Sequence, residues 1–474
     1  MCRTSIFVCL AVFLGFAGQL PAQMIFDNGG DHTVTGEVTE DVYVLNQSHV
    51  MIDATYLRDV YVTDAIVDHL NGNLDLRNIV VSENGVFNSR VRGSGRYKVV
   101  DSNVNFYEGL RLEGDALDAS GTSIVQLLSG DYWETTGERI KIRGDSQILV
   151  TANAAVYVPT FMYDYSHGDA TNSQMSSIVL SGHSSFNVNG GVLHEAQSDD
   201  NWSDGWLRLY DDARFAMSDG ELRRTRDNEA PAVVTNQRSH VMLQNVKADW
   251  TFPLYGAGAS MFRATGESLI QIDSGEYQLH AVPMDRVTGG FALIEDAAQI
   301  VIRGGIFEIT GLADFGNGQS GIFELNGNSR LSISGGVFRS DTYTSYPPPL
   351  LPPHVLFTSG NSQADISGGT FEVRLDSQPG NSPELRHLEA IDTSTITLHG
   401  TGFNYPFGSV SDTEGTITGF LMDGSPFEWN FFRESSARIL LVPEPSVSWL
   451  LVGGITPIAA LLRRGANRRI AVVI

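Results

Sequence analysis

The sequence predicts an all-β protein, a parallel β-helix solenoid with coils of about 30 residues, followed by a membrane-spanning C-terminal tail. Two features of the body predict this fold. A short unit recurs along the chain and combines an alternating strand, a glycine turn and an aromatic residue or leucine. Glycine is abundant, at 49 residues, while apolar residues remain plentiful, so disorder is a poor description.

Residues 1–22 read as a secretory signal peptide. Arg3 precedes an apolar run from Ile6 to Ala17, and the small residues that follow place a cleavage site near Ala22. The run is short for a transmembrane helix, so a retained N-terminal anchor is the minor alternative. We therefore expect export through the Sec translocon.

Cysteine content and charge exclude several classes of function. Both cysteines, Cys2 and Cys9, fall within the signal peptide, so the mature chain should lack disulfides, thiol catalysis and cysteine metal sites. The formal charge is -24. Removing five arginines and one glutamate with the two terminal segments leaves 26 basic and 54 acidic residues (31 − 5 and 55 − 1), a balance of -28. No nucleic acid is expected as a partner.

Residues 23–120 predict narrower coils. A short alternating strand recurs at Asp41–Val44, Asp59–Val62, Asn78–Val81 and Tyr97–Val100, and the steps between these copies are nearly equal and clearly shorter than in the rest of the chain. Alternation with period two places every second side chain on one face of a strand. We interpret this part as the N-terminal, shorter-coil section of the solenoid.

Residues 121–405 carry the main repeats. The clearest copies are Ala298–Ile309, Ser329–Ser340 and Ser362–Val373. The aligned turn position two residues before the aromatic or leucine is Gly130, Gly191, Gly220, Gly275, Gly305, Gly336, Gly369 and Thr401. Counting the two longest intervals, Gly130 to Gly191 and Gly220 to Gly275, as two periods each gives nine periods averaging about 30 residues. A β-propeller is the second choice, because its units are usually longer.

Stacking these units explains how they bury an apolar face. Ile300 and Ile302 share one side of their strand, as do Leu331 and Ile333. A single strand cannot bury that side, whereas stacked coils form a continuous interior. Glycine suits the tight corners, and the aromatic position, filled by Phe307, Phe338 and Phe371, predicts a stacked ladder.

Two segments depart from the repeat. The run from Pro347 to Pro353 must leave the strand ladder, because proline lacks the N–H donor and favours polyproline II. Residues 406–441 predict the last strands, which cap the open end of the solenoid.

The C-terminal segment, residues 442–474, has three parts. Val442, Pro443, Glu444 and Pro445 are followed by an apolar span from Val447 to Leu462, and this span by the basic cluster Arg463, Arg464, Arg468 and Arg469. A span of this length covers roughly 24 Å as a helix, marginally short of the bilayer core. Arginines favour the cytoplasmic side, so the body should lie outside. A buried C-terminal strand or helix is the alternative.

This arrangement resembles the PEP-CTERM sorting signal of exosortase-processed bacterial proteins. The resemblance covers Val442 to about Arg469 and departs from the pattern in the apolar residues Ile470–Ile474. It implies that an exosortase-like membrane cysteine transpeptidase recognises Val442–Pro445 as the sorting motif, and that the four arginines act as a membrane stop. It also implies delivery of the cleaved protein to the cell surface or the extracellular matrix, in hosts that usually make exopolysaccharide.

Catalysis is the main alternative, because β-helices often host polysaccharide lyases and glycoside hydrolases. The acidic pairs Asp199-Asp200 and Asp211-Asp212 are carboxylates of the required type. Arg139-Ile140-Lys141 and His167-Gly168 are similar to the Arg-Ile-Lys and His-Gly elements of polygalacturonases. Their order along the chain is inverted relative to that family, so exposed strand faces and turns are the favoured interpretation.

Ligand and metal signals are weak. The histidines are scattered without metal-site spacing, and no calcium-binding loop motif occurs, so we assign no cofactor or metal residue and leave weak Ca²⁺ binding open. Trp202, Trp206, Tyr210 and Trp250 are candidates for a sugar platform, although burial is the simpler interpretation. We therefore expect a non-enzymatic structural or adhesive protein that contacts exopolysaccharide, with a passive spacer as the remaining alternative.

Overall fold

The computed structural model describes residues 23–54, 59–71, 74–90, 93–108, 110–134, 139–194, 206–223, 231–252, 260–281, 290–312, 321–344, 354–377 and 386–444. These residues form 42 β-strands and no helix, which confirms the predicted all-β class. The signal peptide, the proline run 347–353 and the chain from Pro445 onward lie outside the described residues. The chain divides into two compact units, Met1–Arg226 and Asp227–Ile474, and each is a parallel β-solenoid.

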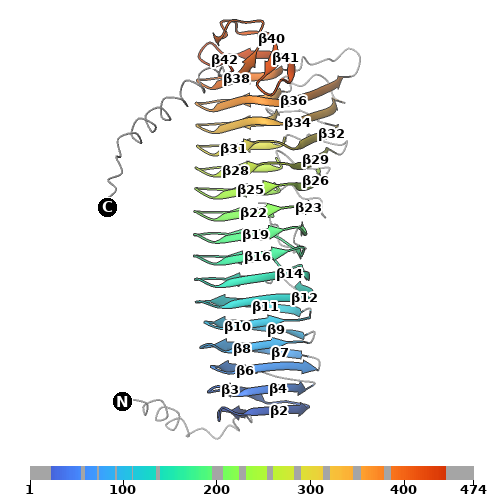
Figure 1. Ribbon diagram of the computed structural model, residues 1–474, viewed down its shortest axis with the longest axis vertical. Coiled ribbons are helices and arrows are strands. Elements are labelled where there is room, and N and C mark those ends of the chain that lie inside the picture. Colours follow the sequence, from blue (N-terminus) through green and yellow to red (C-terminus); the bar gives the residue numbers. More distant parts are fainter. Residues whose placement is uncertain are drawn as a thin grey trace, which may run out of the picture. The chain divides into compact units, whose positions relative to one another are not determined.

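Unit 1 consists of coils that stack one on another (Figure 1), and the strand pairing arranges them in two long faces joined by a short third face. Face A contains β1 (Gln23–Phe26), β3 (Asp41–Leu45), β5 (Asp59–Thr63), β7 (Leu74–Ser82), β9 (Gly93–Val100), β11 (Leu110–Ser120), β13 (Ile140–Ile142), β15 (Thr160–Met162), β18 (Ile178–Leu180) and β21 (Leu207–Leu209). Face B contains β2 (Asp31–Gly36), β4 (His49–Ala54), β6 (Ile66–Asn71), β8 (Val86–Ser89), β10 (Asn103–Phe106), β12 (Ile124–Glu134), β14 (Gln147–Val156), β16 (His167–Thr171), β19 (Ser185–Asn189) and β22 (Arg214–Ser218). Face C contains the N-terminal ends of β7, β9 and β11 and the C-terminal halves of β12 and β14, then β17 (Gln174–Met175), β20 (Val192–His194) and β23 (Glu221–Arg223).

The pairing of these strands is parallel, so the propeller alternative is wrong. Val42 pairs with Val60, and Ile79 pairs with Tyr97. The last strand of the N-terminal series is therefore shifted by one position from the predicted alignment, which matched Asn78 with Tyr97. Because a shift of one position exchanges the faces of a strand, Tyr97 points inward and is 1 % exposed.

Coils in unit 1 are shorter than predicted between Gly130 and Gly191. Gly130 pairs with Ala154, and the registers of the next two rungs align Ala154 with Ser173 and Ser173 with Gly191. The interval between the two glycines therefore contains three coils and not two. The prediction that the longer coils begin at residue 121 is wrong here, because Ala154 and Ser173 replace glycine at the aligned corner. A longer step appears later, where Ile178 pairs with Leu207.

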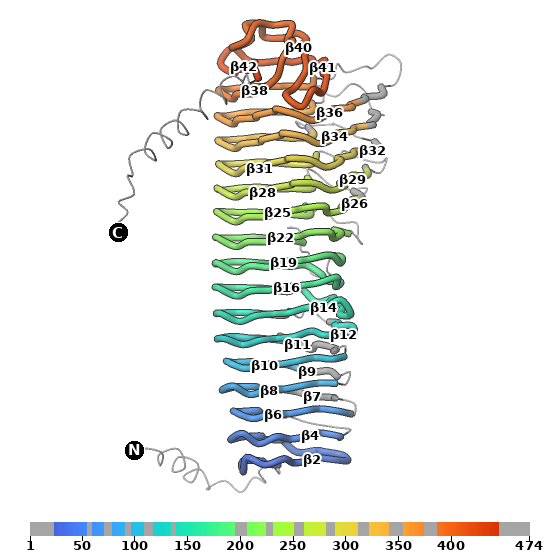
Figure 2. The backbone as a smooth tube through the Cα atoms, in the orientation of Figure 1, coloured from blue at the N-terminus to red at the C-terminus, as the bar shows by residue number. Residues whose placement is uncertain are grey.

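Unit 2 has the same plan, with longer coils (Figure 2). Face A′ contains β24 (Val233–Thr235), β27 (Phe262–Ala264), β30 (Ala292–Ile294), β33 (Gly321–Leu325), β35 (His354–Thr358) and β37 (Arg386–Ala390). Face B′ contains β25 (His240–Gln244), β28 (Leu269–Ile272), β31 (Gln299–Ile302), β34 (Arg330–Thr344), β36 (Gln363–Ser377) and β38 (Thr395–Thr401). Face C′ contains β26 (Val246–Phe252), β29 (Gly275–Ala281), β32 (Ile306–Leu312) and the C-terminal halves of β34 and β36.

The repeat predicted from the sequence is confirmed in unit 2. Ile300 pairs with Leu331, and Leu331 pairs with Ala364, so the coils here have the predicted period. Ile300 and Ile302 are buried as predicted. At the corner, Gly336 has φ of 113°, a conformation that side chains with a Cβ rarely adopt. The expected aromatic ladder is present: the Phe338 ring stacks on Phe307 at 4.9 Å and on Phe371 at 4.6 Å between centroids.

A second recurring corner joins faces A and B in unit 1, and faces A′ and B′ in unit 2. Its first residue is glycine, aspartate or another polar residue with positive φ, such as Gly182 and Asp211 in unit 1. In many coils, a buried serine or alanine lies two residues later, such as Ser184, which is fully buried. Aspartate tolerates this conformation and also binds the neighbouring rung: the Gly182 N–H donates to Asp211 Oδ2 at 3.0 Å.

The C-terminal end of unit 2 changes from coils to antiparallel pairing. It contains β39 (Gly408–Ser409), β40 (Glu414–Leu421), β41 (Pro426–Arg433) and β42 (Arg438–Pro443). Strands β40 and β41 form a hairpin, and β41 also pairs in parallel with β37 of the last coil. Trp429 of β41 packs edge-on against Phe371, with 4.9 Å between ring centroids, so the hairpin covers the end of the aromatic ladder.

Candidate functional site

The predicted sorting motif begins inside the last strand of the described chain. Val442 and Pro443 are the final residues of β42, where they pair with His399 and Gly400 of β38. Ile439 and Leu441 of the same strand point into the core and are 0 % and 1 % exposed. Val442 is half-buried, and Pro443 and Glu444 are exposed. The motif therefore lies where the buried rung gives way to solvent.

The chemistry of Pro443 explains why β42 ends there. Proline has no N–H to donate to a neighbouring strand, so it is compatible with the end of a strand but not with its continuation. On its other side, β42 pairs with only two residues of β39, Gly408 and Ser409, opposite Leu441 and Leu440. Glu444 thus follows the last residue of β42 that pairs with β38.

The rest of the predicted sorting segment is outside the described residues. This applies to Pro445 of the motif, to the apolar span, and to the membrane-stop residues Arg463, Arg464, Arg468 and Arg469. Among the residues described, no helix has the length and hydrophobicity to cross a membrane.

The residues that resemble polygalacturonase elements occupy ordinary positions in unit 1. Ile140 of β13 is fully buried, while Arg139 and Lys141 belong to its outward side. His167 of β16 is hydrogen-bonded through Nε2 to Asp169 at 2.8 Å and through Nδ1 to Ser185 at 2.7 Å. Gly168 points inward, where an added Cβ would overlap the Phe186 ring. The glycine of the His-Gly pair is therefore explained by packing.

Of the two acidic pairs, Asp211-Asp212 lies within the described residues, and both of its carboxylates contact the neighbouring rung. Asp211 accepts the Gly182 N–H at a corner, and Asp212 Oδ2 lies 3.5 Å from His183 Nε2 on the neighbouring rung. Asp199 and Asp200 are outside the described residues. The corner at Asp211 leads into β22, which is two rungs beyond the β16 strand of His167. Among the described residues, His167 and the Asp211 corner therefore belong to different rungs.

Unit 2 contains a buried charged cluster that sequence patterns do not reveal. Glu389 Oε2 lies 3.1 Å from Arg386 Nη1 and 3.2 Å from His354 Nδ1. Burial alone would raise the pKa of Glu389, but the hydrogen bonds and charges of its two partners outweigh it and lower the pKa below the ordinary 4.5. Arg386 and Glu389 are three residues apart, but His354 comes from the preceding strand of face A′, so no local motif could have revealed the whole cluster.

A second carboxylate in the same region behaves in the opposite way. Burial raises the pKa of Glu324, although Asn326 donates a hydrogen bond to it at 3.1 Å. Glu324 and Glu389 are both aligned with Phe357, one rung away on either side, and Phe357 is 1 % exposed. Carboxyl groups with pKa values shifted apart are a feature of acid–base pairs, but the side chain between them is buried.

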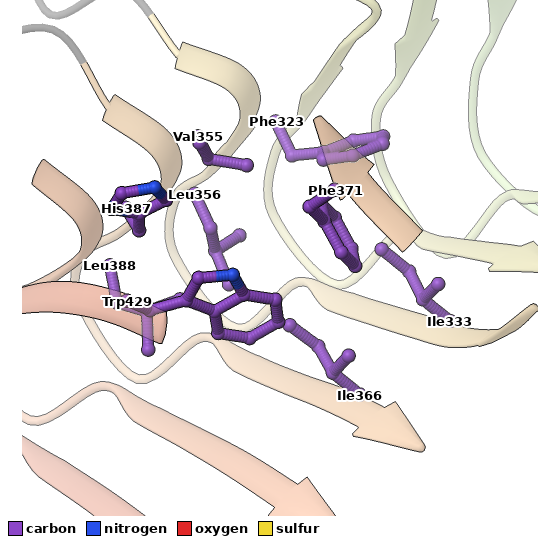
Figure 3. A pocket seen from close by; sticks show the side chains of 9 residues that line it. All are labelled: Phe323, Ile333, Val355, Leu356, Ile366, Phe371, His387, Leu388 and Trp429. Carbon is purple, nitrogen blue, oxygen red and sulfur yellow. The ribbon is translucent and has the colours of Figure 1, made fainter. Parts of the chain in front are cut away.

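A small apolar cavity lies inside the C-terminal end of unit 2. Figure 3 shows its nine lining side chains, among them Trp429 and His387. Most of the other lining side chains are aromatic or aliphatic, such as Phe323, Phe371, Leu356 and Leu388. Burial lowers the pKa of His387 to about 4, so its ring is neutral at pH 7. The lining offers little for a polar ligand.

The aromatic residues considered for a sugar platform are mainly in the core. Trp206 is 2 % exposed and Trp250 is fully buried, so neither forms a surface platform, and Trp202 is outside the described residues. Trp133 of β12, which the sequence analysis passed over, is 51 % exposed and lies 5.3 Å from the Tyr157 ring. Within the described ranges, no three His, Cys, Asp or Glu side chains are placed to hold a metal ion.

Comparisons with known proteins do not extend these assignments. No protein-family model, no curated protein and no solved structure matches the chain.

Proposed function

We propose that this chain is an exported surface or extracellular-matrix protein of structural and adhesive type. An exosortase-like enzyme would recognise Val442–Pro445 and remove the tail, which spans the membrane before processing. The body would be a parallel β-helix whose coils present a repeating outer surface. The proposal rests on one observation above all: the sorting motif starts at the last two residues of the final strand, β42.

The geometry at this position suits removal of a tail. Leu441 is buried and paired, whereas Pro443 and Glu444 are exposed. A membrane enzyme that binds the extended Pro-Glu-Pro element would meet it outside the core. Cleavage after the strand would leave the pairing between β38 and β42 intact, so the processed body keeps its C-terminal closure.

The adhesive part of the proposal is supported by the periodic outer faces. In unit 1 the Tyr43 and Tyr61 rings stack on the outside of neighbouring rungs, 4.5 Å apart and nearly parallel. A parallel solenoid repeats such side chains at about 4.8 Å. A long polymer with its own short repeat can contact many rungs in the same way.

A polysaccharide lyase or glycoside hydrolase is the second candidate. It is favoured by the opposite pKa shifts of Glu324 and Glu389. If these groups act as acid and base, the wild-type protein should release reducing ends from polysaccharides. A variant with either glutamate replaced by glutamine should release none. Wild-type protein that releases no sugar ends from a broad polysaccharide panel would remove this candidate.

Processing is tested by expressing the full chain with a C-terminal epitope tag in a Gram-negative host, with and without an exosortase. The wild type should lose the tag only when the enzyme is present. The variant P443A/E444Q should keep the tag and remain in the membrane fraction. The matched control, E414Q/P426A, changes an exposed glutamate and proline in the C-terminal hairpin and should be processed normally.

Loss of the tag without exosortase, or equal processing of P443A/E444Q and wild type, would contradict the proposal. A melting temperature of P443A/E444Q equal to that of the control variant would show that the substitutions act on recognition and not on folding.

A further inference from the structure

One outer surface of unit 1 is basic although the chain as a whole is strongly acidic. We call it the basic face, and it consists of Arg96 and Lys98 of β9 with Arg139, Lys141 and Arg143 on and beside β13. The intervening side chains Tyr97, Ile140 and Ile142 point inward and are at most 1 % exposed. The five cations therefore share the outward side of face A. The chain has 31 basic and 55 acidic residues, so this concentration runs against its composition.

Strand register brings the cations together. Asp118 of β11 pairs with Lys98 on one side and with Lys141 on the other. Among the described side chains on the outward side of face A from β9 to β15, Asp118 is the one carboxylate. Its Oδ2 lies 3.5 Å from Arg143 Nη2. At the bordering corner, Asp101 and Asp164 accept the backbone N–H groups of Thr122 and Gly144. Among the described side chains, the basic face thus carries more cations than carboxylates.

Aromatic rings hold two of the guanidinium groups in place. The Arg139 guanidinium carbon lies 4.9 Å from the centre of the Phe161 ring, and that of Arg143 lies 5.9 Å from the Tyr163 ring. Phe161 of β15 pairs with Lys141 of β13, so the two residues lie on neighbouring rungs. Guanidinium groups in a fixed position lose less conformational entropy on binding, and their planar fork matches a carboxylate.

The same column of outward side chains continues past the cations to a pair of stacked tyrosines. From Lys98 it passes through Val80 to Tyr61 and Tyr43. Between Tyr61 and Phe161 the column crosses five rung steps, roughly 24 Å at about 4.8 Å per step. The column therefore has aromatic rings at both ends of a stretch that contains Lys98, Asp118 and Lys141.

We propose that the basic face binds an anionic, carboxylate-bearing polysaccharide that lies along the stacking direction of unit 1. The rung spacing is close to the length of one sugar ring in an extended glycan, so alternate uronate units meet the two cation-bearing rungs, β9 and β13. Arginine and lysine receive the carboxylates, and the exposed rims of Tyr43 and Tyr61 receive sugar faces. This inference rests on the proposed surface function and specifies its partner.

The test measures binding of the full-length protein in detergent to polygalacturonate, with neutral dextran and poly-L-glutamate as comparison ligands. Two double variants remove the same charge: K98Q/K141Q within the basic face, and R214Q/K247Q, which replaces exposed cations outside it. We expect polygalacturonate to bind, added salt to weaken binding, and K98Q/K141Q to weaken it by about tenfold or more. R214Q/K247Q should bind like the wild type.

Three results would overturn the inference: no binding of polygalacturonate by a folded wild type, equal losses in the two double variants, or binding of poly-L-glutamate as tight as that of polygalacturonate. The last result would assign the basic face to an acidic protein. Each leaves tail cleavage by an exosortase unaffected, so failure of this inference is distinguishable from failure of the proposed function.

Discussion

His387 accepts a hydrogen bond at Nδ1 from the backbone N–H of Asn430, with 3.2 Å between the nitrogens. This bond joins the last strand of face A′, β37, to the C-terminal hairpin strand β41. An imidazole can accept at Nδ1 only while that atom carries no proton. This hydrogen bond, one of several contacts between the hairpin and the last coil, therefore requires a neutral histidine.

We expect this histidine to make unit 2 less stable in acid. Burial lowers the pKa of His387 to about 4 from the ordinary 6.5. Between these values the unfolded chain binds a proton that the folded chain excludes, so the free energy of unfolding falls as the pH drops from about 6.5 to about 4. The loss is at most about 3 kcal/mol, and denaturant unfolding at several pH values measures it.

The variant His387→Asn is the matched comparison, because its amide oxygen can accept the same N–H but does not titrate. Its free energy of unfolding should change less with pH than that of the wild type over the same range. Identical pH profiles for the two proteins would contradict the assigned role of His387.

The aromatic ladder should contribute strongly to stability. Phe338 is fully buried between Phe307 and Phe371 and also packs edge-on against Phe323, so Phe338→Ala removes three ring contacts and leaves a cavity. We expect a loss of about 3–5 kcal/mol in the free energy of unfolding. Phe407→Ala is the control, because Phe407 is 54 % exposed and should change stability little. Equal losses of unfolding free energy for the two variants, measured by chemical denaturation, would show that the ladder does not stabilise the core.

Gly168 should tolerate no side chain. Phe186 of the next rung occupies the space that a Cβ would need, so Gly168→Ala must displace the ring. Such overpacking costs about 1–3 kcal/mol. Gly30→Ala meets no neighbouring atom closer than 3.4 Å and should be close to neutral. If both variants melt at the wild-type temperature, the packing explanation for the His-Gly pair is wrong.

The sequence predicted the parts of the fold that depend on local patterns. Alternating residues such as Ile300 and Ile302 identified the buried side of the strands, and the glycines from Gly275 to Gly369 identified the register of unit 2. These predictions succeeded because each depends on one strand or one corner, and because the same residue types recur at nearly equal intervals.

The predictions failed where the same structural position is filled by different residues. Ala154 and Ser173 occupy a corner that is glycine in many of the other coils, which hid one coil of unit 1. The second corner alternates between residues such as Gly182 and Asp211, and only the buried serine or alanine two places later reveals its period. The charged cluster around Glu389 and the basic face could not be predicted, because they depend on register between distant strands.

The proposed delivery is tested most directly by the intact mass of the protein recovered from the cell surface of a host that contains an exosortase. Our account predicts a chain that lacks the signal peptide and ends close to Val442–Pro445, directly after β42. A surface protein that retains Arg463, Arg464, Arg468 and Arg469 would contradict it.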